Sequence, residues 1–226
     1  MADIIKATRS VLFDFDGPVC EVFSGIPASE VARTLVDVMR EFDVELSKKM
    51  EGMDFMDALR VSPQAGEHAL RAVEDRLVEA EIAAVKAADG PTLGSVASIE
   101  AARTSGRDVA IVSNNSPQCV REFLAAHNLT SLVQEVVGRP TYQPHRMKPS
   151  PYMLRMTASR LGVTPQECTL VGDSVTDIEA AISAGSMSIG YANRPGKEIS
   201  LAGAGADAVI GSMDVLTRAL KDGSPV

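Results

Sequence analysis

Short, uninterrupted runs of hydrophobic residues recur along the chain, and the segments between them carry hydrophobic residues at helical spacing. The four clearest runs and two weaker ones cover residues 10–14, 108–113, 168–173 and 187–191, and residues 132–137 and 207–210. Because the runs do not alternate with polar residues, we predict strands that are buried on both faces. Strands and helices in regular succession predict an α/β fold with a doubly wound, Rossmann-like parallel sheet.

Signals for helix starts and ends divide the segments between the runs. Ser-Pro pairs at residues 116–117 and 150–151 predict a capping serine followed by proline at the first helical position. Thr164 and Ser174 each begin a sequence that resembles a capping box. Three glycines stand where helices are expected to end: Gly106, Gly162 and Gly185.

Residues 21–88 break this succession, because they contain helical patterns and no strand candidate. Hydrophobic positions are helically spaced in residues 29–42 and 67–88, and a shorter helix is predicted near residues 55–61. We therefore predict an all-helical cap subdomain over residues 21–88, inserted into an α/β core domain made of residues 1–20 and 89–226. Asp89-Gly90-Pro91 is a plausible return hinge.

Composition narrows the class of partner. The chain has 226 residues, of which 45% are hydrophobic, and a net charge of −8. It has no run rich in lysine and arginine, which argues against nucleic acid or an acidic membrane surface as a partner. A small-molecule substrate is favoured, and the oligomeric state is left open.

Three cysteines, Cys20, Cys119 and Cys168, are far apart and form no C-x-x-C pair, so we expect reduced thiols in a cytoplasmic protein. Cys20 follows Asp16 by four residues, but a small buried hydrophobic role is favoured for it. The first residues lack the features of a signal peptide, and no run approaches the roughly 20 apolar residues that span a bilayer. We expect residues 222–226 to be frayed.

The most informative segment is residues 11–17, a hydrophobic run that ends in Asp14, Asp16 and Gly17. Side chains two residues apart in an extended chain point the same way, so both carboxylates are expected to leave the strand together. Two such like charges need a cation or a shared proton. The arrangement fits one carboxylate that attacks, one that moves a proton, and a divalent cation between them.

Other polar residues follow further predicted strands or precede a helix, namely Ser113, Lys148 and Asp173. Ligands of open α/β sheets bind beyond the carboxyl ends of the strands, so the fold should gather these residues at one edge.

These segments together resemble the four ordered motifs of the haloacid dehalogenase superfamily, in particular its phosphoglycolate-phosphatase-like branch with a helical cap. The motifs are Asp14-Phe-Asp16-Gly17, Ser113-Asn114-Asn115, Lys148-Pro149 and Gly172-Asp173 with Asp177. Any one of them is weak evidence, but four in order at fitting spacing are specific. The resemblance covers the whole chain, including the helical insertion.

The resemblance implies catalytic roles that agree with the reasoning from the residues. Asp14 is expected to be the nucleophile and Asp16 the general acid and base. Ser113, Asn114 and Lys148 are expected to bind the substrate, with Lys148 offsetting negative charge. Mg²⁺ is the expected cofactor, held by three groups: the Asp14 carboxylate, the Asp16 backbone carbonyl and Asp173.

Some positions allow competing interpretations. Asp177 can serve the Ser174 capping box alone, or orient Lys148 or a metal-bound water. Pro18 stands where the family commonly has threonine, and we expect catalysis to survive because the Phe15 and Asp16 amides remain. His145 and Arg146 could contact the substrate, but we favour the interpretation that they belong to a solvated loop. His68 is expected on the cap surface.

The leading hypothesis is a Mg²⁺-dependent phosphatase, a phosphoric monoester hydrolase that acts on a small phosphorylated metabolite through a phospho-aspartate intermediate. A phosphosugar mutase or phosphotransferase on the same scaffold is one alternative, and a catalytically silent binding protein is the other. The substrate itself cannot be predicted from the sequence, because cap residues set it.

Overall fold

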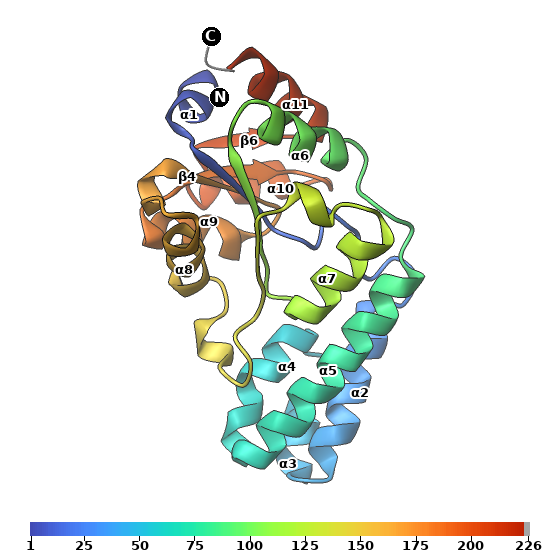
Figure 1. The fold of residues 1–226 in the computed structure, drawn as a ribbon. Coiled ribbons are helices and arrows are strands. Elements are labelled where there is room, and N and C mark those ends of the chain that lie inside the picture. Colours follow the sequence, from blue (N-terminus) through green and yellow to red (C-terminus); the bar gives the residue numbers. More distant parts are fainter. Residues whose placement is uncertain (224–226) are drawn as a thin grey trace.

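A computed structural model describes residues 1–223 and shows a six-stranded parallel sheet with helices on both faces and a helical segment below it (Figure 1). The strand order is β3-β2-β1-β4-β5-β6, and every neighbouring pair is parallel. The strands are β1 (Ser10–Phe13), β2 (Asp108–Val112), β3 (Glu135–Val137), β4 (Cys168–Gly172), β5 (Met187–Tyr191) and β6 (Ala208–Ile210). All six predicted strands and the doubly wound class are confirmed.

Strand β1 lies at the centre of the sheet, between β2 and β4, and the chain order reverses there. Such a reversal opens a crevice at the carboxyl ends of the two central strands. Both faces of β1 are buried: Val11 and Phe13 contribute to one hydrophobic cluster, and Leu12 contributes to another. The uninterrupted hydrophobic run in the sequence follows from this double burial.

Helices cover each face of the sheet. One face carries α1 (Ala2–Ala7), α6 (Ser95–Thr104), α7 (Pro117–Ala126) and α11 (Met213–Asp222). The other face carries α8 (Tyr152–Leu161), α9 (Val175–Ala184) and α10 (Lys197–Gly203). Short 3₁₀ turns occur at Thr130–Leu132, Pro144–Arg146 and Pro165–Glu167.

Most of the predicted helix signals are confirmed. Ser116 caps α7 with Pro117 at its first position, and the Ser174 side chain accepts a hydrogen bond from the Asp177 amide at the start of α9. The prediction for residues 150–151 is wrong by one position, since α8 begins at Tyr152 and Pro151 is its cap residue. The reason is a turn in which the Ser150 amide donates to the Met147 carbonyl.

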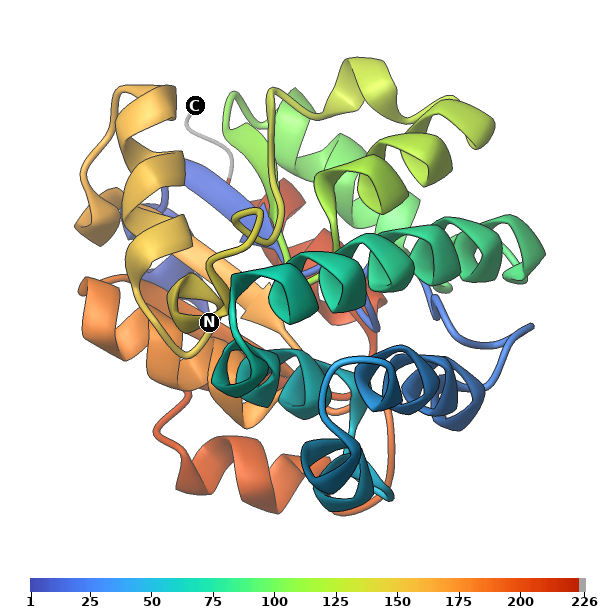
Figure 2. The same ribbon diagram turned by 90° about the horizontal axis from the view of Figure 1, so that it is seen from below.

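Four helices and one 3₁₀ turn form the segment inserted after β1. They are α2 (Ala28–Arg40), α3 (Val44–Met50), α4 (Phe55–Val61), the turn Ser62–Ala65 and α5 (Glu67–Ala87). Viewed from below, they lie in front of the sheet's carboxyl edge (Figure 2). Their inward residues form a hydrophobic cluster of their own, which includes Leu35, Leu59 and Leu77. The sequence did not predict α3 or α1, which are both too short to show a helical period.

Helix α5 is shared between the two parts of the molecule. Val73 and Leu77 belong to the cluster of the inserted segment, whereas Ala84 and Val85 belong to a cluster of the sheet. The chain leaves and re-enters the sheet-containing part at neighbouring points, because Cys20 forms an isolated bridge with Pro91. The Thr92 amide also donates to the Val19 carbonyl at 2.9 Å.

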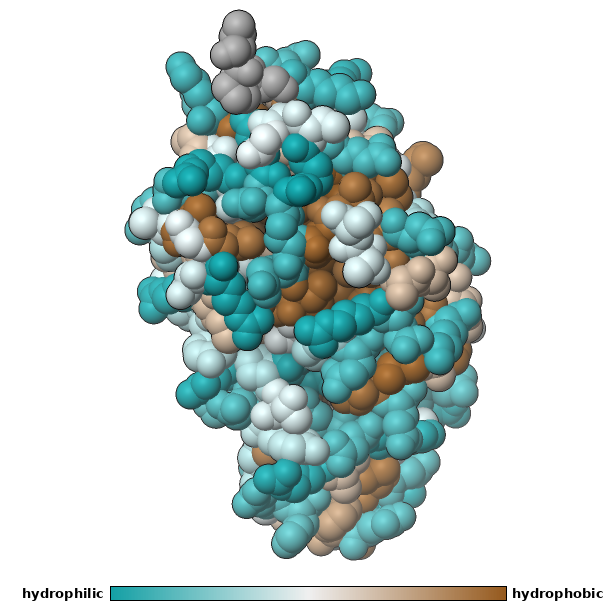
Figure 3. All heavy atoms as spheres, in the orientation of Figure 1, coloured by the Kyte–Doolittle hydropathy of each residue, from teal (hydrophilic) through white to brown (hydrophobic). Residues whose placement is uncertain are grey.

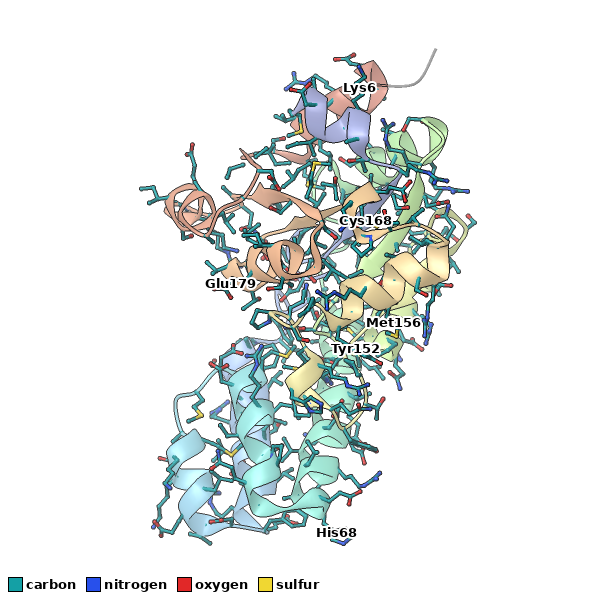
Figure 4. All side chains as sticks on the ribbon, turned by 90° about the vertical axis from the view of Figure 1, so that its left-hand side faces the viewer. Lys6, His68, Tyr152, Met156, Cys168 and Glu179 are labelled. Carbon is teal, nitrogen blue, oxygen red and sulfur yellow. The ribbon has the colours of Figure 1, made fainter. Side chains whose placement is uncertain are left out.

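The surface is mainly hydrophilic on the face drawn in Figure 3, with hydrophobic residues showing between polar ones. His68 lies exposed at the far end of the inserted segment, as predicted (Figure 4). Over residues 1–223, none of the helices is long and apolar enough to cross a membrane. The prediction of a frayed end lies mostly outside the described residues, although Asp222 is still helical.

Candidate active site

Three connections at the carboxyl edge of the sheet bring four charged side chains together. Asp14 follows β1, Asp173 follows β4, and Asp177 lies in the first turn of α9. Lys148 comes from the long connection between β3 and α8. These residues, up to 163 positions apart in sequence, form one cluster in which Asp14, Lys148 and Asp177 are buried and Asp173 is partly exposed.

Asp14 is held by two groups at one of its oxygens. Its Oδ1 accepts a hydrogen bond from the Phe15 amide at 2.7 Å and lies 2.8 Å from Lys148 Nζ. Burial, followed by the charge of Asp177, raises the pKa of Asp14 to about 8, and Lys148 opposes this rise. A cation bound beside it would favour the ionised, nucleophilic form.

Asp16 lies at the turn that follows. Its Oδ1 accepts from the Val22 amide at 3.0 Å, and burial raises the pKa of this carboxyl to about 7. A carboxyl group with a pKa near neutrality can give a proton and take one back. The turn is closed by the Gly17 amide, which donates to the Cys20 carbonyl at 2.8 Å.

Two glycines allow the acidic side chains to lie against the backbone. Gly17 has φ +99, and a β-carbon there would come within 2.6 Å of the Asp173 carboxylate. At Gly172 an added β-carbon would meet the Asp177 side chain at 2.4 Å. Any larger residue would therefore push Asp173 or Asp177 out of the cluster.

Lys148 is 1% exposed and lies between the acidic groups. Its Nζ is 2.8 Å from Asp14 and 2.5 Å from Asp177 Oδ1, and it donates to the Val112 carbonyl at 3.0 Å. Burial lowers the pKa of Lys148, but Asp14 and Asp177 outweigh burial and raise the pKa above its ordinary value. The ammonium group therefore stays charged inside the site.

Asp177 contacts both Ser174 and Lys148, so the capping box is not its sole partner. Its Oδ1 accepts from Lys148, while its Oδ2 accepts from the amide and hydroxyl of Ser174 at 3.0 and 2.6 Å. The side chain closes the capping box of α9 and fixes the lysine at the same time. Because the bonds to Ser174 fix the orientation of the Asp177 side chain, they also fix the position of the Lys148 ammonium group.

The loop after β2 is tied to Lys148. Asn114 Oδ1 accepts from the Lys148 amide at 2.8 Å, and Asn114 Nδ2 donates to the Lys148 carbonyl at 3.2 Å. Ser113 Oγ donates to Asn115 Oδ1 at 3.1 Å. The structure thus places Asn114 as a support for Lys148 and Ser113 as a neighbour in the same loop.

Asp173 is bound by two residues that the sequence reasoning missed. Lys197 Nζ pairs with Asp173 Oδ2, and Asn193 Nδ2 donates to the same oxygen at 3.2 Å. Burial raises the pKa of Asp173 and Lys197 opposes the rise. Both partners follow β5, whose carboxyl end lies at the same edge of the sheet. Their position directly after a predicted strand was the one sequence signal that could have identified them as site residues.

Three carboxylates offer a site for a cation. One oxygen each from Asp14, Asp173 and Asp177 lies within 4.8 Å of the others. Oxygen ligands of this kind suit Mg²⁺, which keeps several waters and needs few protein ligands. The fit differs from the predicted set by including Asp177, whose two oxygens are both engaged, Oδ1 by Lys148 and Oδ2 by Ser174. The bonds to Asp14 end on Oδ1 alone and those to Asp173 on Oδ2 alone, so these two are the better candidates for carboxylate ligands.

A cavity of about 670 Å³ opens above this cluster. It is lined by five of the predicted site residues, Asp14, Asp16, Ser113, Asn114 and Asp173. The inserted segment and the β5–α10 loop add residues that were not predicted, among them Glu21, Phe23, Phe55, Arg60 and Arg194. The cavity therefore combines an acidic floor with walls that carry aromatic side chains and both arginines and acidic residues.

Three residues considered from the sequence have other contacts. Arg146 lies over the Tyr152 ring at 4.3 Å, and His145 is exposed. Cys20 is fully buried, and burial raises the pKa of its thiol to about 12, as suits a small hydrophobic residue. Beside Pro18, the Phe15 amide is engaged by Asp14 Oδ1, so it is less free to meet a substrate than expected.

Comparison with known proteins gives a consistent family. The model of a family described as "Hydrolase: haloacid dehalogenase-like hydrolase" matches residues 8–185. The phosphoglycolate phosphatase of Aliivibrio fischeri is 36% identical over 104 residues, which are 45% of this chain and 45% of that protein. The phosphoglycolate phosphatase of Xylella fastidiosa is 26% identical over 182 residues, covering 80% of this chain and 79% of that protein. The first of these matches thus spans less than half of the relative's length.

Solved structures with the same fold align with nearly the whole of this chain. A hydrolase of the haloacid dehalogenase family from Deinococcus radiodurans, solved with bound phosphate and sodium, is 25% identical with a TM-score of 0.64 over 96% of this chain and 97% of its own. A family IA hydrolase from Entamoeba histolytica is 17% identical with a TM-score of 0.68 over 95% of this chain and 100% of its own. The second similarity shows the fold alone.

Proposed function

The chain belongs to the haloacid dehalogenase-like hydrolases, and on this basis we propose that it is a Mg²⁺-dependent phosphatase of a small phosphorylated metabolite. One observation carries the proposal: the buried carboxylate of Asp14 is paired with Lys148 at 2.8 Å at the point where the strand order reverses. A nucleophile beside a fixed cation is the arrangement that phosphoryl transfer requires.

Asp14 attacks the phosphorus through Oδ2, the oxygen that is not bonded to Phe15 or Lys148. Both the Phe15 amide and Lys148 bond to Oδ1, which leaves Oδ2 for the new P–O bond. The P–O bond to the leaving group breaks as the phospho-aspartate forms. Asp16 gives its proton to the leaving oxygen. Water then attacks the phosphorus while Asp16 takes a proton from it, and the bond between the phosphorus and Asp14 Oδ2 breaks, which releases phosphate and restores both carboxyl groups.

Lys148 and Ser113 bind the phosphoryl group, and Asn114 positions Lys148. The Lys148 ammonium offsets charge on the phosphoryl oxygens, and the Ser113 hydroxyl turns its hydrogen bond from Asn115 Oδ1 to a phosphoryl oxygen. Asn114 acts through the two hydrogen bonds that fix the Lys148 backbone. Mg²⁺ held by Asp14, Asp173 and the Asp16 carbonyl would neutralise phosphate charge and align the group for attack.

We propose residues 21–88 as a cap that closes the cavity against bulk water. Phe23, Phe55 and Arg60 line the cavity from this segment, so they are in a position to select the substrate. The curated relatives are phosphoglycolate phosphatases, which makes 2-phosphoglycolate the first metabolite to assay.

The test is hydrolysis of an aryl phosphate and a panel of phosphorylated metabolites by purified protein with Mg²⁺. We expect Asp14→Asn to lower kcat by about 10³-fold or more, because the amide cannot form the intermediate. Removal of metal with EDTA should abolish activity, and adding Mg²⁺ should restore it.

Asp37→Asn is the matched control, since Asp37 is exposed on α2 and pairs with Arg40. Its activity should equal that of the unaltered protein. Equal activity in Asp14→Asn would refute the mechanism. Transfer of phosphate to a second sugar hydroxyl rather than to water would identify a mutase, and no turnover of any ester would identify a binding protein.

A further inference from the structure

Arg139 is a fully buried cation outside the catalytic cluster. It follows β3 and is 1% exposed, yet its side chain reaches two glutamates of α5. Nε lies 3.0 Å from Glu74 Oε1, and Nη1 lies 2.8 Å from Glu81 Oε1. The same Nη1 donates to the Asn114 carbonyl at 2.8 Å, so one guanidinium joins the inserted segment to the loop after β2.

Glu81 adds further bonds to that loop. Its Oε2 accepts from the Ser116 amide at 2.9 Å, and its Oε1 accepts from Asn115 Nδ2 at 3.3 Å. Asn115 in turn accepts the hydrogen bond of the Ser113 hydroxyl. A chain of hydrogen bonds therefore runs from α5 to the residue proposed to bind phosphate.

The connection from Arg139 to Lys148, which we name the strap (residues 139–148), is fastened to the inserted segment along its length. The Tyr142 amide donates to Glu74 Oε2 at 2.7 Å, and Tyr142 Oη donates to Asp75 at 2.8 Å. Met147 is 2% exposed and belongs to the hydrophobic cluster of the inserted helices. The strap thus carries Lys148 into the site while its own side chains pack on the cap.

Three hydrogen bonds from two side chains hold the Lys148 backbone. Arg60 Nη2 of α4 donates to the Lys148 carbonyl at 2.9 Å, and Asn114 bonds to both the amide and the carbonyl. The Arg139 side chain donates to the Asn114 carbonyl, and the Arg139 backbone amide donates to the Asn115 carbonyl at 2.9 Å. Arg139 thus ties the loop after β2 to the start of the strap. Movement of Arg139 would therefore reach Lys148 by two routes.

We propose that Arg139 is a positioning residue: it locks the Ser113–Asn114 loop and the Lys148 strap onto Glu74 and Glu81 of α5, so that the catalytic arrangement forms only with α5 seated against the sheet. The kinetic part of this inference rests on the proposed phosphatase function. The structural part does not, because it concerns which segments hold one another.

The primary test is Arg139→Lys, which keeps a cation beside the two carboxylates but cannot reach Glu74, Glu81 and the Asn114 carbonyl at once. We expect kcat to fall by about 10–100-fold while KM changes less, since the catalytic groups are displaced rather than removed. Amide hydrogen exchange should speed up in residues 113–116 and 139–148. Glu79→Gln is the control, because Glu79 pairs with Arg76 on the exposed face of the same helix.

A second measurement separates positioning from simple loss of stability. In an Asn114→Ala background Lys148 has lost the two hydrogen bonds of the Asn114 side chain, which form one of the two routes from Arg139, so Arg139→Lys should cost less than it does alone. Unchanged exchange in both segments, or fully additive effects on kcat at a temperature well below unfolding, would overturn the inference. If the unaltered protein hydrolyses no ester, the proposed function fails, while the exchange data still decide whether Arg139 locks the two segments.

Discussion

Glu167 shows how one partly exposed carboxylate can hold a turn in place. It accepts from the Thr164 amide at 2.8 Å and the Thr164 hydroxyl at 2.9 Å, and it pairs with Arg9 at 3.0 Å. These bonds, with the Thr164 amide first, lower the pKa of Glu167 to about 2. The ionised form is thus favoured in the folded state just before β4.

This pKa shift predicts a pH-dependent contribution to stability. Because the folded pKa lies below the unfolded value of about 4.3, the contribution is present above pH 4.3 and is lost as the pH falls toward 2. We expect Glu167→Gln to be less stable than the unaltered protein at pH 7 and equally stable near pH 2. Urea unfolding across this range measures the difference, and a gap that does not change with pH would contradict the prediction.

Residues with a role set by local sequence were predictable, and residues with a role set by distant partners were not. The Asp14–Gly17 turn and the Ser174 capping box are short patterns whose geometry follows from neighbouring residues. Lys197 and Arg139 have no such pattern: each looks like a surface cation in sequence. Only the fold shows that Lys197 reaches Asp173 and that Arg139 is buried between two glutamates.

At the scale of elements, the inserted helices have a core separate from the sheet. Leu35 of α2 is fully buried there among Leu59 and Leu77 from α4 and α5. Phe23 and Phe55, with ring centroids 4.7 Å apart, join this cluster to the wall of the cavity. Packing in the inserted segment should therefore affect both stability and the shape of the cavity.

Leu35→Ala should reduce the free energy of unfolding by about 2–5 kcal/mol, because it leaves a cavity among closely packed helices. Leu93→Ala provides the same chemical change at a side chain that is 89% exposed, and there we expect a change within about 0.5 kcal/mol. Thermal or urea unfolding of the two variants gives the comparison. Equal losses would show that Leu35 is not part of a packed core.

Strands and long helices were predictable because burial leaves a repeating pattern. The six strands and helix α5 follow from uninterrupted or helically spaced hydrophobic positions. Helix α3 has seven residues and α1 has six, so neither spans two full periods. The sharing of α5 between two clusters was also not predictable, since the pattern shows that a helix face is buried but not against what.

For the molecule as a whole, the main unfavourable electrostatic effect is repulsion among the carboxylates of the candidate active site. Asp14, Asp173 and Asp177 lie together in a chain of net charge −8, with Lys148 and Lys197 as the nearby cations. Like charges at such distances oppose folding unless more positive charge is supplied. A bound divalent cation would supply it and stabilise the folded state.

Addition of Mg²⁺ should raise the melting temperature. At a concentration about 100 times the dissociation constant, the expected rise is roughly 5–10 °C for a chain of this size. Asp173→Asn should remove most of the rise, whereas Asp37→Asn should keep it. A thermal-shift series with Mg²⁺ measures this, and an equal rise in Asp173→Asn would place the ion elsewhere.

The chain departs for the inserted helices and comes back at two adjoining positions, where Cys20 bridges Pro91 and the Thr92 hydroxyl donates to the Gly17 carbonyl at 2.7 Å. An excursion anchored in this way can change in length without altering any pairing between strands. Because Glu74 and Glu81 of this excursion hold Arg139, and Arg60 holds the Lys148 carbonyl, a replacement of different size would have to keep these three side chains in place while the rest of its cavity wall varies.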